Sequence, residues 1–206
     1  MEGCNSANVP VLANTKLSIQ ADDKKADATL FKQIVGSLRY VCNSRPDISY
    51  CVGLVSRFMS DPRQSHLSTA KHILPYLKGT IDFGLCFPKK TDRMTGVLKA
   101  WSDSDWCGDQ KDRKSTFGYV IKYMGAWFSC CSKKQSVVAL SSCKAEYIAS
   151  AKTACQCAWL ETILDELKIE CCKPIQLLID NRSVINLSKN PISHGRSKHI
   201  RPNFII

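Results

Sequence analysis

Between residues 96 and 190, the apolar segments follow an order that few folds can accommodate. Three short segments rich in β-branched and aromatic residues come first, separated by turn residues: VLKAWSD, TFGYVIKYM and AWFSCCS. A helical pattern follows from Ser142 to about Leu167, and after it come the apolar run IQLLID and the short helical pattern NRSVINLSKN. The predicted order is therefore three strands, a helix, a fourth strand and a helix.

The long predicted helix determines how the fourth strand can pair. A helix that crosses over from the meander lets the first and fourth strands lie side by side and parallel. Because IQLLID is continuously apolar, we expect a strand covered on both faces. The apolar residues predicted to share the buried face of the helix are Ala145, Ile148, Ala149, Leu160, Ile163, Leu164 and Leu167. Residues 96–206 are thus predicted to form an α/β (α+β) domain with a mixed sheet and flanking helices.

The chain before residue 96 has a different pattern. Residues 1–27 are polar and irregular and predict a linker-like segment. Residues 28–95 are predicted to be a small helical segment with helices in ATLFKQIVGSLRYV, DISYCVGLVSRFM and SHLSTAKHILPYL. We expect Gly79 to end the third helix in a left-handed conformation. His66 and His72, in that helix, are expected on its surface or at packing edges.

Three carboxylates fall where this topology brings the chain together. Asp103 ends the first predicted strand and Asp180 ends the fourth, so parallel pairing makes them neighbours. Glu146 lies in the first turn of the intervening helix, on the side expected to face the sheet. Like charges so close raise one another's pKa unless a cation neutralises them, and a hard cation, magnesium first, fits oxygen ligands.

Each carboxylate also has a simpler interpretation. Asp103 and Asp105 are typical of a turn after a strand, and Asp180 is typical of a helix cap. Glu146 is a favourable charge near a helix N-terminus. Taken alone, each of these is about as good as the metal-site interpretation, but they do not predict that all three converge.

The charge balance of the chain is strongly basic, with a formal net charge of +11. A basic surface of that size is typical of proteins that bind a polyanion. The alternative is a basic protein whose charge serves only solubility. The cations near the predicted site, proposed as nucleic-acid-binding residues, are Lys111, Arg113, Lys114, Lys133, Lys134, Arg196, Lys198 and Arg201.

Twelve cysteines are present, and we expect most of them to be buried thiols rather than disulfides, because several lie inside apolar segments: Cys42, Cys51, Cys130, Cys131 and Cys155. No C-x-x-C occurs, and His194 and His199 have no paired cysteines nearby, so no structural zinc site is predicted. The sequence has neither a long apolar run nor a signal-peptide pattern, and we expect an intracellular chain without a membrane span.

Several long motifs resemble a known family. WSDSDWCGDQKDRKSTFGYV, SCCSKKQSVVALSSCKAEYIAS, LLIDNRSVINLSKNP and HGRSKHI closely resemble the ribonuclease H domain of copia-type long-terminal-repeat retrotransposon polyproteins. LFKQIVGSLRYVCNSRPDISYCVGLVSRFM and HLSTAKHILPYLKGTIDFGL resemble the helical thumb and connection behind the reverse transcriptase of the same polyproteins. Together these motifs cover nearly the whole chain, in the order and spacing of the family.

The resemblance implies a ribonuclease H-like fold and an endonuclease that hydrolyses the RNA strand of RNA–DNA hybrids with two magnesium ions. In that scheme, one ion activates the attacking water and the other steadies the leaving oxygen. Asp103, Glu146 and Asp180 match the family's first three metal-binding carboxylates, which implies catalytic and metal-binding roles for them. Asp105 matches a family residue beside the site and has at most a supporting role.

The sequence also departs from the family pattern. No Asp or Glu follows Asp180, whereas the family's fourth metal-binding aspartate lies in a later segment with a last strand and helix. Cys143-Lys144 stand where the family usually has Thr-Glu, and Arg201-Pro202 stand where it continues with an aspartate. The paired aspartates of the polymerase palm are absent as well. We therefore expect a C-terminally truncated piece of a polyprotein.

Two interpretations of function stay open at this point. One is a weak hybrid-specific ribonuclease that works with three carboxylates. The other is a catalytically inactive remnant that binds nucleic acid, or that does not fold stably without the last strand unless other polyprotein segments supply the missing elements. A third interpretation, a helical interaction module over residues 28–80, rests only on the amphipathic helices.

Overall fold

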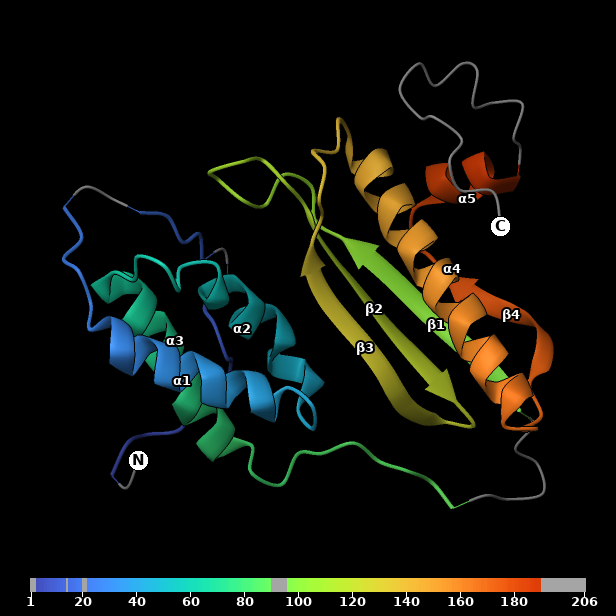
Figure 1. The fold of residues 1–206 in the computed structure, drawn as a ribbon, viewed down its shortest axis with the longest axis horizontal. Helices are drawn as coiled ribbons and strands as arrows, with labels where there is room; N and C mark the ends of the chain where they lie inside the picture. The colour runs from blue at the N-terminus through green and yellow to red at the C-terminus, as the bar shows by residue number, and fades with distance from the viewer. Residues whose placement is uncertain (1–2, 14, 20–21, 90–95, 190–206) are drawn as a thin grey trace. The chain divides into compact units, whose positions relative to one another are not determined.

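The computed structural model describes residues 3–13, 15–19, 22–89 and 96–189, and the chain divides into two compact units, Met1–Leu85 and Cys86–Ile206. The first unit is helical and the second contains a sheet (Figure 1). The predicted α/β class with a mixed sheet and flanking helices is confirmed.

The first unit contains α1 (Ala28–Val41), a 3-10 turn η1 (Pro46–Ile48), α2 (Ser49–Ser56) and α3 (Gln64–Gly79). Asp27 is the N-cap of α1, because its side chain accepts hydrogen bonds from the backbone amides of Thr29 and Leu30. The apolar faces of the three helices pack together around Phe31, Val35, Leu38, Ile48, Val55 and Ile73. The irregular segment before α1 packs onto the same core through Ala7, Val11, Leu17 and Ala26.

The predicted surface position of His66 is wrong. Its ring is fully buried and stacks on Phe58 with ring centroids 3.8 Å apart. Nδ1 accepts a hydrogen bond from the Arg63 amide at 3.1 Å, and Nε2 lies 3.2 Å from the Ser18 carbonyl oxygen. The irregular N-terminal segment supplies Ser18, so the sequence pattern of α3 alone could not reveal this burial. His72 is half-buried, in agreement with a packing edge.

The end of α3 also differs from the prediction. Gly79 does not have a positive φ and lies within the helix, and Thr80 follows it with φ −126°. The Thr80 hydroxyl donates to the Tyr76 carbonyl at 2.8 Å, and Arg45 donates to the Thr80 carbonyl at 2.9 Å. These side chains satisfy groups at the helix end that a left-handed glycine would otherwise have to satisfy.

The second unit contains β1 (Val97–Ser104), β2 (Thr116–Tyr123), β3 (Ala126–Lys134), α4 (Ser142–Glu166), β4 (Cys172–Leu178) and α5 (Arg182–Lys189). The strand order is β3-β2-β1-β4, with β1 antiparallel to β2 and parallel to β4. Met124 and Gly125 make the tight β2–β3 turn, and both have positive φ. This arrangement agrees with the predicted meander and crossover (Figure 1).

The core of the second unit lies between α4 and one face of the sheet. Leu98 and Ala100 of β1 and Ile121 of β2 pack there against α4 residues such as Cys157 and Leu160. Gly96, just before β1, accepts a hydrogen bond from the Cys172 amide at 2.7 Å. A Cβ atom at residue 96 would lie 2.2 Å from the Glu170 carbonyl oxygen, so only glycine fits where β1 meets the entry to β4.

Two details of this packing correct the sequence prediction. The fourth strand is not covered on both faces, because Ile175 and Leu177 pack on the core beside α4 whereas Leu178, on the opposite face of β4, is 43% exposed. Ile163 of α4 and Leu167, the residue directly after α4, are exposed, since both point away from the stripe that holds Leu160 and Leu164.

The cysteines are all free thiols, in agreement with the absence of predicted disulfides. The prediction that most of them are buried is wrong. Cys51 and Cys157 are buried, whereas Cys130 and Cys155 are exposed. Alternation along β3 places Cys130 on the face of the sheet opposite Cys131, which is half-buried.

Candidate active site

The candidate site lies at the carboxyl ends of the two parallel strands. The last pair between β1 and β4 joins Trp101 to Leu178, and Asp103 and Asp180 each lie two residues further along the chain. Equal spacing from one pair brings both carboxylates to the same edge of the sheet, as the predicted topology requires.

The third carboxylate, Glu146, comes from the N-terminal part of α4, but not from its first turn as predicted, because the helix begins at Ser142 and Glu146 lies in the second turn. Gln135, directly after β3, fixes this end of the helix. Its side-chain amide donates to the Ala145 carbonyl at 2.9 Å and to the Ser104 hydroxyl of β1 at 3.1 Å. The residue before Glu146 is therefore tied to both β1 and the end of β3.

The three carboxylates converge. One oxygen from each of Asp103, Glu146 and Asp180 can be chosen so that all three atoms lie within 4.8 Å of one another. Glu146 is 7% exposed, whereas Asp103 and Asp180 are exposed. Burial first, and then the charges of Asp103 and Asp180, raise the pKa of Glu146 to about 7, against an opposing hydrogen bond from the Ser104 backbone.

The donor set fits a hard divalent cation. Glu146 Oε2 is buried and has no hydrogen-bond partner among the described residues. A buried carboxylate oxygen without a partner is costly, and three neighbouring negative charges add to that cost. Magnesium prefers oxygen ligands, and carboxylates are its usual protein donors. Asp103, Glu146 and Asp180 are the residues that would hold such an ion.

A pocket of about 560 Å³ opens beside the carboxylates. Asp103 and Asp180 line one part of it, and Trp101 and Leu178 line another. The pocket therefore offers both charged and apolar contacts next to the carboxylate oxygens.

Asp105 lies beside this site and has a local role. Its amide donates to the Thr116 carbonyl at 3.1 Å, and its Oδ1 accepts from the Thr116 amide at 2.6 Å. These two bonds close the base of the β1–β2 loop, as the turn interpretation of this residue predicts.

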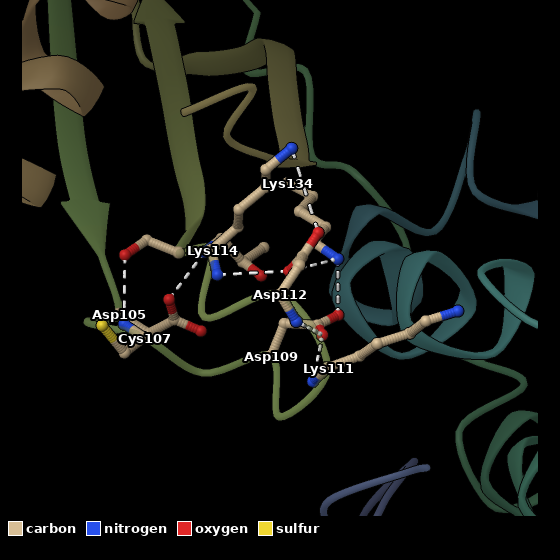
Figure 2. Close-up of polar contacts among 9 residues, drawn as sticks. Asp105, Cys107, Asp109, Lys111, Asp112, Lys114 and Lys134 are labelled. Atoms are coloured by element: carbon tan, nitrogen blue, oxygen red, sulfur yellow. Dashed lines mark hydrogen bonds and ion pairs between the residues drawn. The ribbon is translucent and has the colours of Figure 1, made fainter. Parts of the chain in front are cut away.

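The predicted nucleic-acid-binding cations fall into two groups. Lys134 Nζ lies 2.6 Å from Asp109 Oδ2 and 2.8 Å from Asp112 Oδ1, and Lys114 Nζ lies 3.9 Å from Asp112 Oδ2 (Figure 2). Lys111, Arg113 and Lys133 are exposed instead. The remaining predicted cations and the two tail histidines lie outside the described residues: Arg196, Lys198, Arg201, His194 and His199.

Sequence reasoning missed Asp109, Asp112 and Gln135. The two aspartates are three residues apart in a polar loop, a pattern that is common in turns. No local pattern indicates their pairing with Lys134, because the chain separation between Asp109 and Lys134 is 25 residues.

Comparison with known proteins reveals the origin of the chain. It is 42% identical over 192 residues to the retrovirus-related Pol polyprotein from transposon RE1 of Arabidopsis thaliana. The aligned region covers 93% of this chain and 13% of that protein. It is 38% identical over 208 residues to the retrovirus-related Pol polyprotein from transposon TNT 1-94 of Nicotiana tabacum, which covers 97% of this chain and 15% of that protein. The chain belongs to the transposon Pol polyprotein family. The predicted copia-type retrotransposon origin is thereby confirmed.

The Pol relatives are much longer than this chain, which spans 13 to 15% of their length. A third relative, the secreted RxLR effector protein 161 of Plasmopara viticola, is 42% identical over 127 residues, 61% of this chain and 87% of that protein. No family model matches the chain. Within the part of the chain that the structure describes, no helix has the length and apolar character to cross a membrane.

Proposed function

We propose that this Pol region is a ribonuclease H-like domain that hydrolyses the RNA strand of RNA–DNA hybrids with magnesium. The observation that carries the proposal is the convergence of Asp103, Glu146 and Asp180 from three different elements, with a buried and unpartnered Glu146 oxygen. The family resemblance of the surrounding motifs and the identity with transposon Pol polyproteins support it.

In this proposal, Asp103, Glu146 and Asp180 hold the divalent ions. Bound magnesium supplies an activated water and charge stabilisation for the leaving oxygen of the phosphodiester. Glu146 binds as the carboxylate, so its proton leaves when the ion enters. The exposed cations Lys111, Arg113 and Lys133 contact phosphates, and contacts to the 2′-hydroxyl distinguish RNA from DNA.

A second candidate function is nucleic-acid binding without cleavage. It is favoured by the count of carboxylates in the described site, where Asp103, Glu146 and Asp180 converge. Three carboxylates hold one divalent ion better than two ions at a separation of about 4 Å, whose mutual repulsion must be offset. We therefore propose that a polypeptide of these 206 residues cleaves weakly, and that other polyprotein segments are partners that raise its activity.

The deciding experiment is a cleavage assay on a labelled RNA–DNA hybrid, with and without magnesium. We expect slow, magnesium-dependent cleavage of the RNA strand alone, which Asp103→Asn abolishes and the matched variant Glu166→Gln, at the exposed end of α4, leaves unchanged. Salt-sensitive binding without cleavage would favour the second candidate. A parent chain that neither binds nor cleaves the hybrid would overturn both.

A further inference from the structure

A second polar network, apart from the three-carboxylate site, ties the β1–β2 loop to the end of β3 (Figure 2). Asp109 Oδ1 accepts from the backbone amides of Lys111 at 2.9 Å and Asp112 at 3.3 Å, while its Oδ2 accepts from Lys134. Asp112 Oδ1 accepts from the Lys114 amide at 3.2 Å and also lies 2.8 Å from Lys134 Nζ. Each aspartate therefore shapes a turn of the loop and binds the same lysine.

The ion pair between Lys134 and Asp109 is partly shielded from water, whereas the Asp112 side chain is 38% exposed. The side chains of Asp109 and Lys134 are 12% and 28% exposed, so their attraction is screened less than that of a surface pair. The loop needs such support, because Cys107 and Arg113 have φ values of 54° and 58°, a conformation that non-glycine residues adopt only when their surroundings favour it. Lys134 is thus a side chain of the sheet that pairs with both aspartates of this loop.

The loop also carries cationic side chains that take no part in the ion pairs with Asp109 and Asp112. Lys111 and Arg113 are exposed, and so is Lys133 at the end of β3. In Figure 2 the Lys111 side chain extends away from the ion pairs. Among the residues that the structure describes, we find no ion pair for these three side chains.

The residue that pairs with the loop aspartates, Lys134, is adjacent in sequence to Gln135, which binds the start of the helix that carries Glu146. Gln135 follows Lys134, is 3% exposed, and donates to the Ala145 carbonyl and the Ser104 hydroxyl. Ala145 precedes Glu146. Two consecutive residues at the end of β3 therefore fix the cationic loop on one side and the helix that carries Glu146 on the other.

We propose that Lys134 is a positioning residue for a nucleic-acid substrate. It does not contact phosphate; it holds Asp109 and Asp112, so that Lys111 and Arg113 meet the phosphate backbone at a fixed distance from the three-carboxylate site. This inference rests on the proposed nucleic-acid function. It has an unusual consequence: loss of negative charge from the loop should weaken the binding of a polyanion.

The principal test is the double variant Asp109→Asn/Asp112→Asn in the full 206-residue chain. Asparagine keeps a side-chain oxygen for the turn hydrogen bonds and loses only the ion pairs. Binding of a labelled RNA–DNA hybrid is measured in magnesium-free buffer over a series of KCl concentrations. Charge alone predicts tighter binding after the loss of two negative charges, whereas the positioning role predicts binding about 60-fold weaker, equivalent to the two phosphate contacts of Lys111 and Arg113 near 0.1 M salt. The control Glu166→Gln/Glu170→Gln removes two exposed charges elsewhere and should not weaken binding.

Variants at the end of β3 supply an independent test. Lys134→Met should reduce the salt slope by about two contacts, roughly 1.8, because Lys111 and Arg113 lose their positions, while Lys133→Met should reduce it by about one contact, roughly 0.9. Lys134→Arg should restore binding to within about twofold, since a guanidinium can pair with both aspartates. Thermal melting checks that each variant is folded.

Three results would overturn the positioning role. The first is tighter binding by the double asparagine variant, and the second is equal salt slopes for Lys134→Met and Lys133→Met. Both leave the proposed function standing. The third is a parent chain that does not bind the hybrid at any salt concentration, which removes the positioning role and the proposed function together.

Discussion

Two groups of carboxylates adjoin the same end of β1, and their electrostatic surroundings are opposite. At the three-carboxylate site, burial and the charges of Asp103 and Asp180 raise the pKa of Glu146 to about 7. In the β1–β2 loop, burial alone would raise the pKa of Asp109, but hydrogen bonds from Lys134 and from two backbone amides lower it to about 2. The ionised form of a carboxyl group is therefore destabilised at Glu146 and stabilised at Asp109.

The difference separates the proposed metal site from a structural element. Asp109 carries its compensating cation within the chain, so its charge stabilises the folded state without any ligand. Glu146 has two negative neighbours and a buried oxygen without a partner, so its charge destabilises the folded state until a cation binds. Titratable groups with strongly shifted pKa values and no internal compensation are typical of functional sites.

The largest effect that follows from this comparison is expected for Glu146→Gln. Because the folded-state pKa of Glu146 is raised to about 7 from 4.5, its destabilising effect is absent below about pH 4.5, grows as the pH rises, and is complete above about pH 7. Without divalent ions, the variant should have a free energy of unfolding about 2 kcal/mol higher than the parent near pH 8, and about the same near pH 4.5. Urea unfolding at the two pH values measures this, with Glu166→Gln as the control. A variant less stable than the parent near pH 8 would contradict the interpretation.

A smaller effect of opposite sign is expected in the loop. Lys134→Met leaves Asp109 and Asp112 without their cation and should lower the free energy of unfolding by about 1–2 kcal/mol at neutral pH, while Lys133→Met should change it by less than about 0.5 kcal/mol. The folded-state pKa of Asp109 is lowered, so its stabilising effect is present above about pH 3.8 and is lost as the pH falls through about 2. Urea unfolding between about pH 7 and 2 should therefore show the parent and Lys134→Met converging at the acid end. Equal effects of the two lysine variants would show that the ion pairs do not stabilise the loop.

The smallest effect is stabilisation by magnesium. At about five times its dissociation constant, magnesium should stabilise the parent chain by about 1 kcal/mol near pH 8, because it binds the folded state through Asp103, Glu146 and Asp180. Thermal melting in magnesium chloride, against sodium chloride of equal ionic strength, measures the shift. Asp103→Asn should abolish it, and Asp109→Asn should retain it. A shift of the same size in both variants would place the ion elsewhere.

The sequence predicted the three-carboxylate site because the site depends on the order of elements. Asp103 and Asp180 end strands that a crossover helix makes parallel, and the position of Glu146 follows from the start of that helix. The helices and strands were also predictable, from helical spacing of apolar residues in segments such as ATLFKQIVGSLRYV and from short apolar runs such as IQLLID.

Other features could not be predicted because they depend on contacts between distant segments. His66 is buried by the irregular chain around Ser18, which has no pattern of its own. From the sequence alone Lys134 is an ordinary surface cation, because its partner Asp109 lies 25 residues earlier in the chain. The exposure of Leu178 depends on which face of β4 packs on the core, which a continuous apolar run does not reveal.

The close contact at Gly96 limits which substitutions copies of the transposon can carry at this position. A strand advances about 3.3 Å per residue, so a slip of β4 by two residues along β1 would move Asp180 about 7 Å from its place beside Asp103. Gly96 accommodates the Glu170 carbonyl at the other end of the same strand pair, so it helps set this alignment from a distance. A copy of the transposon that acquired any larger side chain at residue 96 would keep all three carboxylates in its sequence and still lose their alignment. Decay of such copies can therefore begin at a glycine far from the chemistry.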